Sequence, residues 1–254
     1  DETTIHGWYV VPAFLKKDKF PCLIHYHGFN GNRGKPADFM HFIMMGIAVV
    51  SVDIREQSGT TGNCANYSSG HIQNVVCQGV LNKEEYYFRA VYMDCLKAID
   101  FAVSQPEVDG SRIAIEGGSQ GGALAMAVSA LDTRPRLVMA DVPGNSNITR
   151  RVEGAHGALA SVTQYLTLYP HHTDQVFKTL SYFDTMNMAD KINCKVLASV
   201  ALKDNVCPAE LYFATYNRIR SEKQIEIYPF NGHEGGGGIH TEIKLRFLKK
   251  NLLD

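Results

Sequence analysis

Short hydrophobic segments alternate along the chain with longer segments whose hydrophobic positions recur at helical spacing. The segments that we predict to be strands are Gly7–Val11, Cys22–Tyr26, Ala48–Asp53, Ile113–Glu116, Leu137–Ala140, Val196–Ala201 and Ile225–Tyr228. The predicted helices are Pro36–Met45, Glu84–Val103, Gly121–Leu131, Asp174–Leu180, Ala209–Ile219 and His240–Asn251. This alternation predicts an α/β fold with a mostly parallel, doubly wound sheet and helices on both faces.

Two segments interrupt the alternation. Gln57–Lys83 is polar, contains glycine and has no clear period, and it is long for a loop, so we expect a functional or interfacial role. Asn145–Asp184 reads as helical, and we interpret residues 145–184 as an insertion that lies near the active site. The length of 254 residues suits one domain that spans 1–254.

The segment Gly117–Gly122 carries the most specific chemistry. It follows the predicted strand Ile113–Glu116, precedes the helix Gly121–Leu131, and places Ser119 at the apex of a G-x-S-x-G turn. In that setting the motif is the nucleophile elbow of α/β-hydrolases. The glycines are needed because a serine on so tight a turn has strained dihedral angles, and a neighbouring Cβ would clash.

A serine nucleophile needs a base and an orienting carboxylate, which follow it in the order acid, then histidine. Asp204 lies just after the strand Val196–Ala201, and His233 follows the last strand. The competing residues are Asp184 and Asp190, which follow no strand, His240, which lies at the start of a predicted helix, and Glu234, read as a loop carboxylate that fixes the turn. We therefore predict Ser119, Asp204 and His233 as the catalytic triad.

The oxyanion hole is expected to use two backbone N–H groups. One belongs to Gln120, the residue after the nucleophile, and the other to the loop after an early strand. In that loop, His27–Gly31, we choose the N–H of Phe29.

Composition narrows the choice of partners. The formal net charge is -1, which gives no general attraction to nucleic acid or to an anionic membrane. This small net charge also favours a neutral substrate, unless a cluster of charged residues at the site gives it a different local charge. No apolar run reaches the ~20 residues of a membrane helix, so we expect no membrane partner. The chain starts at Asp1, which leaves open whether a leader or a longer N-terminal segment precedes it.

The six cysteines form no C-x-x-C pair and no metal-site spacing, so we read them as buried thiols of a reducing compartment. A disulfide between Cys64 and Cys77, which flank a polar loop, is a minor alternative. His25 and His27 share one face of a strand, but no carboxylate cluster accompanies them. We therefore predict no metal and no cofactor.

Several stretches together resemble one family, the acetyl xylan esterase / cephalosporin C deacetylase family (carbohydrate esterase family 7). They are His27–Gly31, Gly117–Gly122, Ala140–Pro143, Thr179–Asp184, His233–Gly236, Leu202–Pro208 and Tyr86–Arg89. The similarity runs from about Ile5 to Leu252.

This resemblance implies an α/β-hydrolase with Ser119, Asp204 and His233 as its triad. It implies removal of acetyl groups from short xylo-oligosaccharides and from cephalosporin C, in a cytoplasmic homohexamer whose active sites face an internal chamber. Pro143 falls in a matching stretch, and Arg55 and Gln57 are the outer residues of a further family motif, Arg-Gly-Gln. We expect all three to support the pocket or its loops.

The chain departs from the family pattern in three places. Phe29 stands where the family usually has tyrosine, and Glu56 replaces the glycine of an Arg-Gly-Gln motif. The residues that the family carries before its first matching strand are absent from this sequence, which bears on assembly more than on chemistry. The alternatives to an acetyl esterase are a dipeptidyl-peptidase-like hydrolase on the same elbow and an inactive hydrolase that serves as a binding module.

Overall fold

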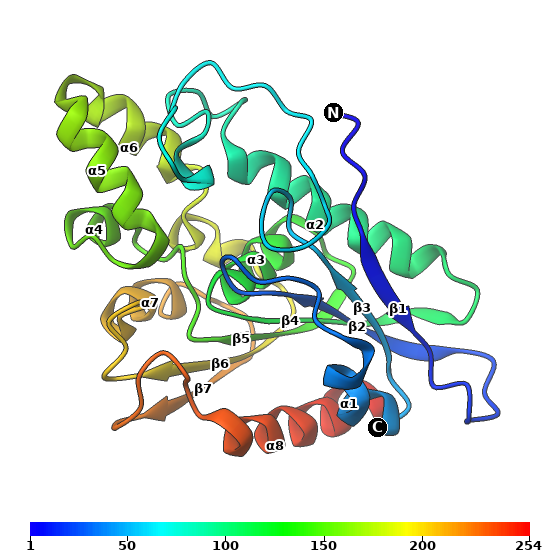
Figure 1. Cartoon of the computed structure of the whole chain (residues 1–254). Coiled ribbons are helices and arrows are strands. Elements are labelled where there is room, and N and C mark those ends of the chain that lie inside the picture. Colours follow the sequence, from blue (N-terminus) through cyan, green and yellow to red (C-terminus); the bar gives the residue numbers. More distant parts are fainter.

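A computed structural model describes all residues from 1 to 254. Figure 1 shows one central sheet with helices on both of its faces. The strands are β1 (Gly7–Val10), β2 (Phe20–Tyr26), β3 (Ala48–Val52), β4 (Val108–Gly118), β5 (Pro135–Asp141), β6 (Lys195–Ala201) and β7 (Lys223–Tyr228). Their order is β1-β3-β2-β4-β5-β6-β7, with β1 antiparallel to β3 and every other pair parallel.

All the predicted strands are present, and their ends shift by a few residues. The largest difference is in β4, which we predicted as Ile113–Glu116 and which extends from Val108 to Gly118. Its first residues alternate little in hydrophobicity, but they pair with β2 near Phe20. Pairing with a neighbouring strand therefore extends β4 beyond its apolar centre.

Alternate residues of the central strands pack on opposite faces of the sheet. In β2, Leu23 belongs to a cluster with Phe42 and Leu248, whereas Ile24 belongs to the larger cluster that contains Ile99. All of these side chains are buried. Both faces of the sheet are thus covered, which is why its strands read as continuous apolar runs.

The helices of the regular α/β pattern are α1 (Met40–Met44), α2 (Tyr87–Ser104), α3 (Gln120–Leu131), α7 (Ala209–Tyr216) and α8 (Gly237–Leu248). The predicted helix Pro36–Met45 is a 3-10 turn followed by the short α1. The predicted helix Glu84–Val103 begins only at Tyr87, because Asn82 holds the preceding residues in a turn through its side chain and its carbonyl. The last helix begins at Gly237 rather than at His240.

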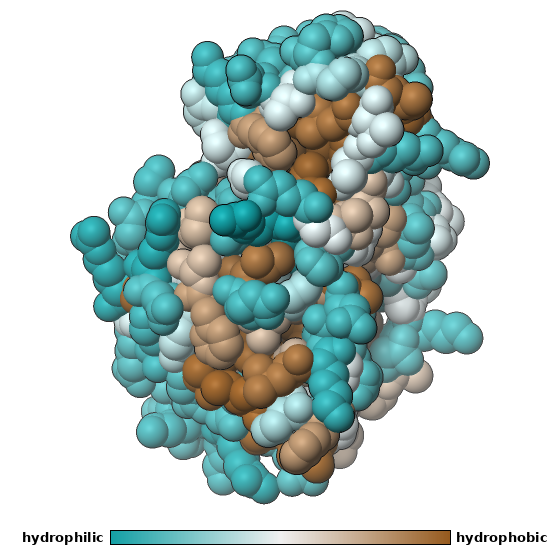
Figure 2. All heavy atoms as spheres, turned by 90° about the vertical axis from the view of Figure 1, so that its left-hand side faces the viewer, coloured by the Kyte–Doolittle hydropathy of each residue, from teal (hydrophilic) through white to brown (hydrophobic).

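The segment between β5 and β6 forms α4 (Ile148–Glu153), α5 (Ala160–Leu168) and α6 (Thr173–Ser181). Figure 1 shows these three helices grouped at one side of the sheet. On that side, Figure 2 shows hydrophobic atoms in hollows between hydrophilic ones. The segment Gln57–Lys83 is irregular apart from a 3-10 turn at Val75–Cys77.

None of the helices combines the length and the hydrophobicity that crossing a bilayer requires. All six cysteines are unpaired, so the alternative of a disulfide between Cys64 and Cys77 is wrong. Cys64 is exposed and Cys194 is half-buried, whereas the other four are buried. The prediction of buried thiols therefore fails for Cys64.

Candidate active site

Ser119 lies at the turn between β4, which ends at Gly118, and α3, which begins at Gln120. Its φ of 58° and ψ of -120° lie in a region that L residues rarely occupy. The N–H of Ser119 donates to the carbonyl of Asp141 at the end of β5, with an N–O distance of 2.8 Å. Neighbouring strands thus hold the strained serine, and its hydroxyl projects from the turn.

The glycines of the elbow permit close packing between backbones. A Cβ on Gly121 would lie 1.9 Å from the carbonyl oxygen of Tyr26, and a Cβ on Gly117 would lie 2.4 Å from the carbonyl carbon of Gly121. The first turn of α3 therefore packs directly on the end of β2. Pro143, expected to support the pocket, is buried and would lie 3.1 Å from a Cβ on Gly122, so it packs against α3 and does not line the pocket.

The structure brings Ser119, His233 and Asp204 into one line of hydrogen bonds. Ser119 Oγ lies 3.0 Å from His233 Nε2, and His233 Nδ1 lies 2.8 Å from Asp204 Oδ2. The other oxygen of Asp204 accepts the N–H groups of Val206 and Cys207, both at 2.8 Å. Asp204 follows β6 and His233 follows β7, so the carboxyl ends of adjacent strands deliver both side chains.

The carboxylate of Asp204 is buried but fully paired. Burial alone would raise its pKa, but the hydrogen bond from His233 and the backbone N–H groups outweigh that effect and lower the pKa. Asp204 is therefore ionised at neutral pH. An ionised carboxylate on Nδ1–H leaves Nε2 of His233 free to accept the proton of Ser119.

The two residues predicted to supply the oxyanion donors both lie beside Ser119. Gln120 is the first residue of α3, so its N–H has no acceptor within the helix. Phe29 lies in the loop after β2, and its N–H donates no hydrogen bond within the chain. The loop adjoins the nucleophile, because a Cβ on Gly28 would lie 3.8 Å from Ser119 Cβ. Both predicted donors line one pocket with Ser119.

Gln57 connects the two sides of this oxyanion site. Its Oε1 accepts the backbone N–H of Asn30 at 2.9 Å and the side-chain N–H of Gln120 at 3.1 Å. Its Nε2 donates to Gln120 Oε1 at 3.0 Å and to the Tyr87 hydroxyl at 3.1 Å. One side chain thus fixes both the loop that carries Phe29 and the residue after the nucleophile.

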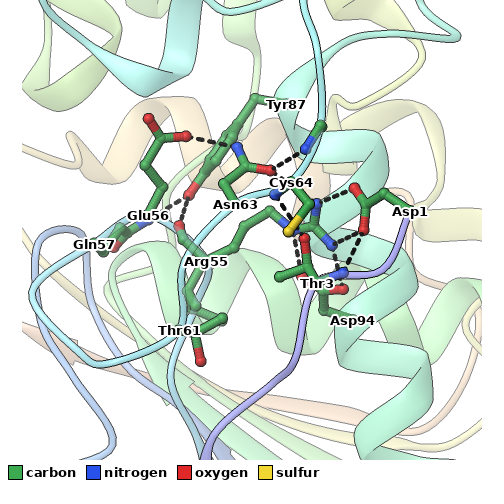
Figure 3. A network of polar contacts seen from close by, with 12 residues as sticks. Asp1, Thr3, Arg55, Glu56, Gln57, Thr61, Asn63, Cys64, Tyr87 and Asp94 are labelled. Carbon is green, nitrogen blue, oxygen red and sulfur yellow. Dashed lines mark hydrogen bonds and ion pairs between the residues drawn. The ribbon is translucent and has the colours of Figure 1, made fainter.

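Arg55 supports the loop and lines no part of the pocket. Its buried guanidinium donates to both oxygens of Asp94 on α2, from Nε at 2.6 Å and from Nη2 at 2.7 Å. It also donates to Asp1 at 2.6 Å and to Asn63 at 3.1 Å. Figure 3 shows the guanidinium reaching between Asp1 and Asp94. Of the two roles expected for Arg55, support of the pocket or of its loops, these contacts fit support of the irregular segment.

Glu56 has a φ of 56°, in the left-handed region that favours glycine. This conformation explains physically why glycine suits the position between Arg55 and Gln57. The Glu56 carboxylate accepts hydrogen bonds from Asn63 at 2.6 Å and from Gln78 at 3.1 Å. Those bonds offset part of the backbone strain.

The pocket beside Ser119 has a volume of about 320 Å³. Sequence reasoning missed several of its lining residues, which are Val76, Phe88, Asn145, Arg151, Leu159 and Cys207. Cys207 could have been found from its place in the Asp204 loop, and its Sγ lies 3.9 Å from Ser119 Oγ. Phe88 lies in a stretch that matched the family. No sequence signal singled out Arg151.

The two histidines weighed as a metal pair take part in other contacts. His25 Nδ1 lies 3.0 Å from a carboxylate oxygen of Glu116. His27 donates to the carbonyl of Gly28 at 2.8 Å and accepts the N–H of Ile54 at 2.9 Å. Both ring nitrogens of His27 are therefore committed to the protein.

A second polar cluster lies under the elbow, between the sheet and α8. Lys244 Nζ lies 3.0 Å from Glu116 Oε2 and 2.8 Å from Asp141 Oδ2. His240 Nε2 lies 2.8 Å from Asp141 Oδ1, so this competitor of His233 is buried away from Ser119. Burial would raise the pKa of Glu116, but attraction to Lys244 and the hydrogen bonds with His25 and Lys244 together outweigh it and hold the pKa far below its usual range. The cluster ties α8 to β4 and β5.

Comparison with known proteins finds that the chain is similar to acetyl xylan esterases. The family model of Acetyl xylan esterase (AXE1) matches residues 1–251. Acetyl esterase Axe7A from Xylanibacter ruminicola is 31% identical over 168 residues, which are 66% of this chain and 37% of that esterase. The chain thus matches little more than a third of that relative.

Two solved acetyl xylan esterases have the same fold. The enzyme from Paenibacillus sp. R4 superposes with a TM-score of 0.94 at 41% identity, over 98% of this chain and 80% of that one. Acetyl xylan esterase 1 from Thermoanaerobacterium sp. JW/SL YS485 gives 0.91 at 32% identity, over 98% and 79% of the two chains.

More distant structures share the fold alone. An acylaminoacyl peptidase from Pyrococcus horikoshii is 16% identical with a TM-score of 0.71, over 98% of this chain and 39% of that one. It therefore gives the peptidase alternative no support beyond the fold. The predicted α/β-hydrolase fold and family resemblance are confirmed, and the chain belongs to the acetyl xylan esterase family.

Proposed function

We propose that this protein is a serine esterase that removes acetyl groups from acetylated xylo-oligosaccharides and related small acetyl esters. The observation that carries the proposal is the hydrogen-bonded line of Ser119, His233 and Asp204 beside the unpaired N–H of Phe29. Family membership supports the acetyl ester as the bond that is cleaved.

The reaction proceeds in two steps through an acyl-enzyme. His233 takes the proton of Ser119 as Oγ attacks the acetyl carbonyl, and the oxyanion accepts hydrogen bonds from the N–H groups of Phe29 and Gln120. His233 then protonates the departing alcohol and leaves an acetylated serine. In the second step His233 deprotonates a water molecule, which attacks the acetyl carbonyl and releases acetate and free Ser119. Asp204 orients the imidazole and stabilises its protonated form.

The pocket supports a small substrate. Its volume of about 320 Å³ is at the lower end of the range for small-molecule sites. Apolar side chains such as Val76 and Leu159 line the pocket together with the polar side chains of Ser119 and His233. This space suits a short acyl group with part of its alcohol.

The direct test is acetate release by the wild type and by Ser119→Ala. We expect the wild type to hydrolyse 4-nitrophenyl acetate and acetylated xylo-oligosaccharides, and Ser119→Ala to lose this activity while its circular dichroism and melting temperature are retained. Labelling of Ser119 by a fluorophosphonate probe separates an enzyme from an inactive binding module. Undiminished turnover by Ser119→Ala would overturn the assignment.

The finer properties rest on the family resemblance. We propose that cephalosporin C is also deacetylated, and that the protein acts as a homohexamer in the cytoplasm. Six unpaired thiols are compatible with a reducing compartment. Acetate release from cephalosporin C, mass measurement in solution and cell fractionation test these three proposals separately.

A further inference from the structure

Arg151, in the last turn of α4, is a buried cation without a counterion. Its side chain lines the pocket that contains Ser119, and the residue is only 4% exposed. Its neighbour Arg150 is exposed and pairs with Glu153 at 2.9 Å, whereas Arg151 forms no ion pair. An arginine keeps its charge at every physiological pH, so this burial cannot be relieved by loss of a proton.

The hydrogen-bonding capacity of Arg151 is mostly unused. Nη2 donates to the carbonyl of Val206 at 2.9 Å, but Nε is fully buried and has no partner. Gly157 leaves room for the guanidinium, because a Cβ there would lie 3.0 Å from Nη2. A buried charged donor without a partner is costly, which marks it as prepared for a ligand.

The surroundings of Arg151 favour an anion. No aspartate or glutamate lines the pocket, and its charged groups are Arg151 and, when protonated, His233. The negative charge of Asp204 lies behind His233 and is already matched by that ring and two backbone N–H groups. The pocket is therefore locally cationic, although the formal net charge of the whole chain is -1.

We propose that Arg151 binds a carboxylate on the alcohol part of the substrate, so that the protein prefers acetyl esters of carboxylate-bearing alcohols such as O-acetylated uronic acids. This inference rests on the proposed esterase function. The acetyl group is neutral, and its carbonyl oxygen is served by Phe29 and Gln120, so the alcohol is the part of the substrate that can supply the anion. A carboxylate is the charge-assisted acceptor that a guanidinium binds most strongly.

The test compares acetate release from mono-O-acetylated glucuronic acid and from the mono-O-acetylated glucose that differs only at C6. The variants are Arg151→Met, which removes the charge, and Arg151→Lys, which keeps the charge but lacks the branched N–H donors of a guanidinium. Arg150→Met is the matched control. We expect the wild type to prefer the acid, chiefly through a lower KM. Arg151→Met loses about 10- to 100-fold in kcat/KM on the acid and little on glucose acetate or 4-nitrophenyl acetate. Arg151→Lys is intermediate, and Arg150→Met matches the wild type.

Several results would overturn the inference. Equal losses on both sugars would mean that Arg151 only holds the Val206 carbonyl and its loop. A wild type with no preference for the acid refutes the inference while the esterase function stands, whereas no acetate release from any ester refutes the esterase function itself. Inhibition by acetate without a preference for the acid would place the anion at the acyl end.

A measurement on the wild type alone covers the case in which the variants do not fold. We expect glucuronate to inhibit hydrolysis of 4-nitrophenyl acetate competitively and at least about tenfold more strongly than glucose. Equal inhibition by glucuronate and glucose would contradict the inference.

Discussion

The side-chain amides of Gln57 and Gln120 exchange two hydrogen bonds, of 3.0 and 3.1 Å, across 63 positions of sequence. Because Gln57 also accepts the N–H of Asn30, the pair sets the distance between the two oxyanion donors. We expect Gln57→Ala to lower kcat on 4-nitrophenyl acetate by about 10- to 100-fold, since loss of a whole donor costs about 10²–10³-fold.

Gln57→Glu is the matched control for this effect. Glutamate still accepts the N–H of Asn30 but cannot donate to Gln120 Oε1, so we expect an intermediate kcat. A Gln57→Ala enzyme with the kcat of the wild type would show that the oxyanion site does not depend on this brace.

Asp204→Asn tests the orienting role of the carboxylate. Asparagine can keep the hydrogen bonds from the N–H groups of Val206 and Cys207, but its amide favours the wrong tautomer of His233. We expect kcat to fall by about 10³–10⁴-fold with little change in melting temperature. A loss below tenfold would argue that Asp204 is not the partner of His233.

The elbow glycines differ in their tolerance of a side chain. A Cβ on Gly121 would lie 1.9 Å from the Tyr26 carbonyl oxygen, whereas a Cβ on Gly118 meets nothing nearer than 3.9 Å. We expect Gly121→Ala to lower the free energy of unfolding by about 2 kcal/mol or more, or to prevent folding. Gly118→Ala should fold, and soluble yield with urea unfolding measures both. Equal behaviour of the two variants would contradict this account of the elbow.

Lys244→Met removes the cation that pairs Glu116 and Asp141. The pKa of each carboxyl is lowered in the folded protein, because attraction to Lys244 and hydrogen bonds with Lys244 and a histidine together outweigh burial. Such carboxyls add stability above their unfolded pKa values of about 4, and this stability is lost as the pH falls toward the folded values. We expect the variant to lose about 3–5 kcal/mol of unfolding free energy at pH 7.

The deficit of Lys244→Met should shrink at acidic pH, because protonated carboxyls are buried at lower cost. Urea unfolding at pH 7 and near pH 4 checks this dependence, with the exposed Lys250→Met as the control. A deficit that is constant with pH would mean that Lys244 acts through packing alone.

Replacement of Glu56 separates backbone strain from side-chain contacts. Glu56→Ala and Glu56→Gly both lose the hydrogen bonds to Asn63 and Gln78, but only glycine relieves the φ of 56°. We therefore expect Glu56→Gly to be about 1 kcal/mol more stable than Glu56→Ala. Urea midpoints at equal m-values measure the difference, and equal midpoints would show that the left-handed backbone carries no strain.

The strands, the elbow and the order of Ser119, Asp204 and His233 could be predicted because each depends on a few adjacent residues. Helix starts are less predictable, since the turn before α2 is made by the side chain and the carbonyl of Asn82. Arg151 could not be predicted, because its importance lies in the counterion that it lacks, which is a property of packing. The pairing of Arg55 with Asp94 could not be predicted either, because Asp94 lies 39 positions away.

Asp141 contacts both the nucleophile Ser119 and the helix that follows the base His233. Its carbonyl holds the N–H of Ser119, and its carboxylate holds Lys244 and His240 of α8, the helix that begins shortly after His233. Detachment of α8 from the sheet would therefore also displace the segment that carries His233 from Ser119. We therefore expect gradual heating to abolish hydrolysis in the same transition that melts the sheet.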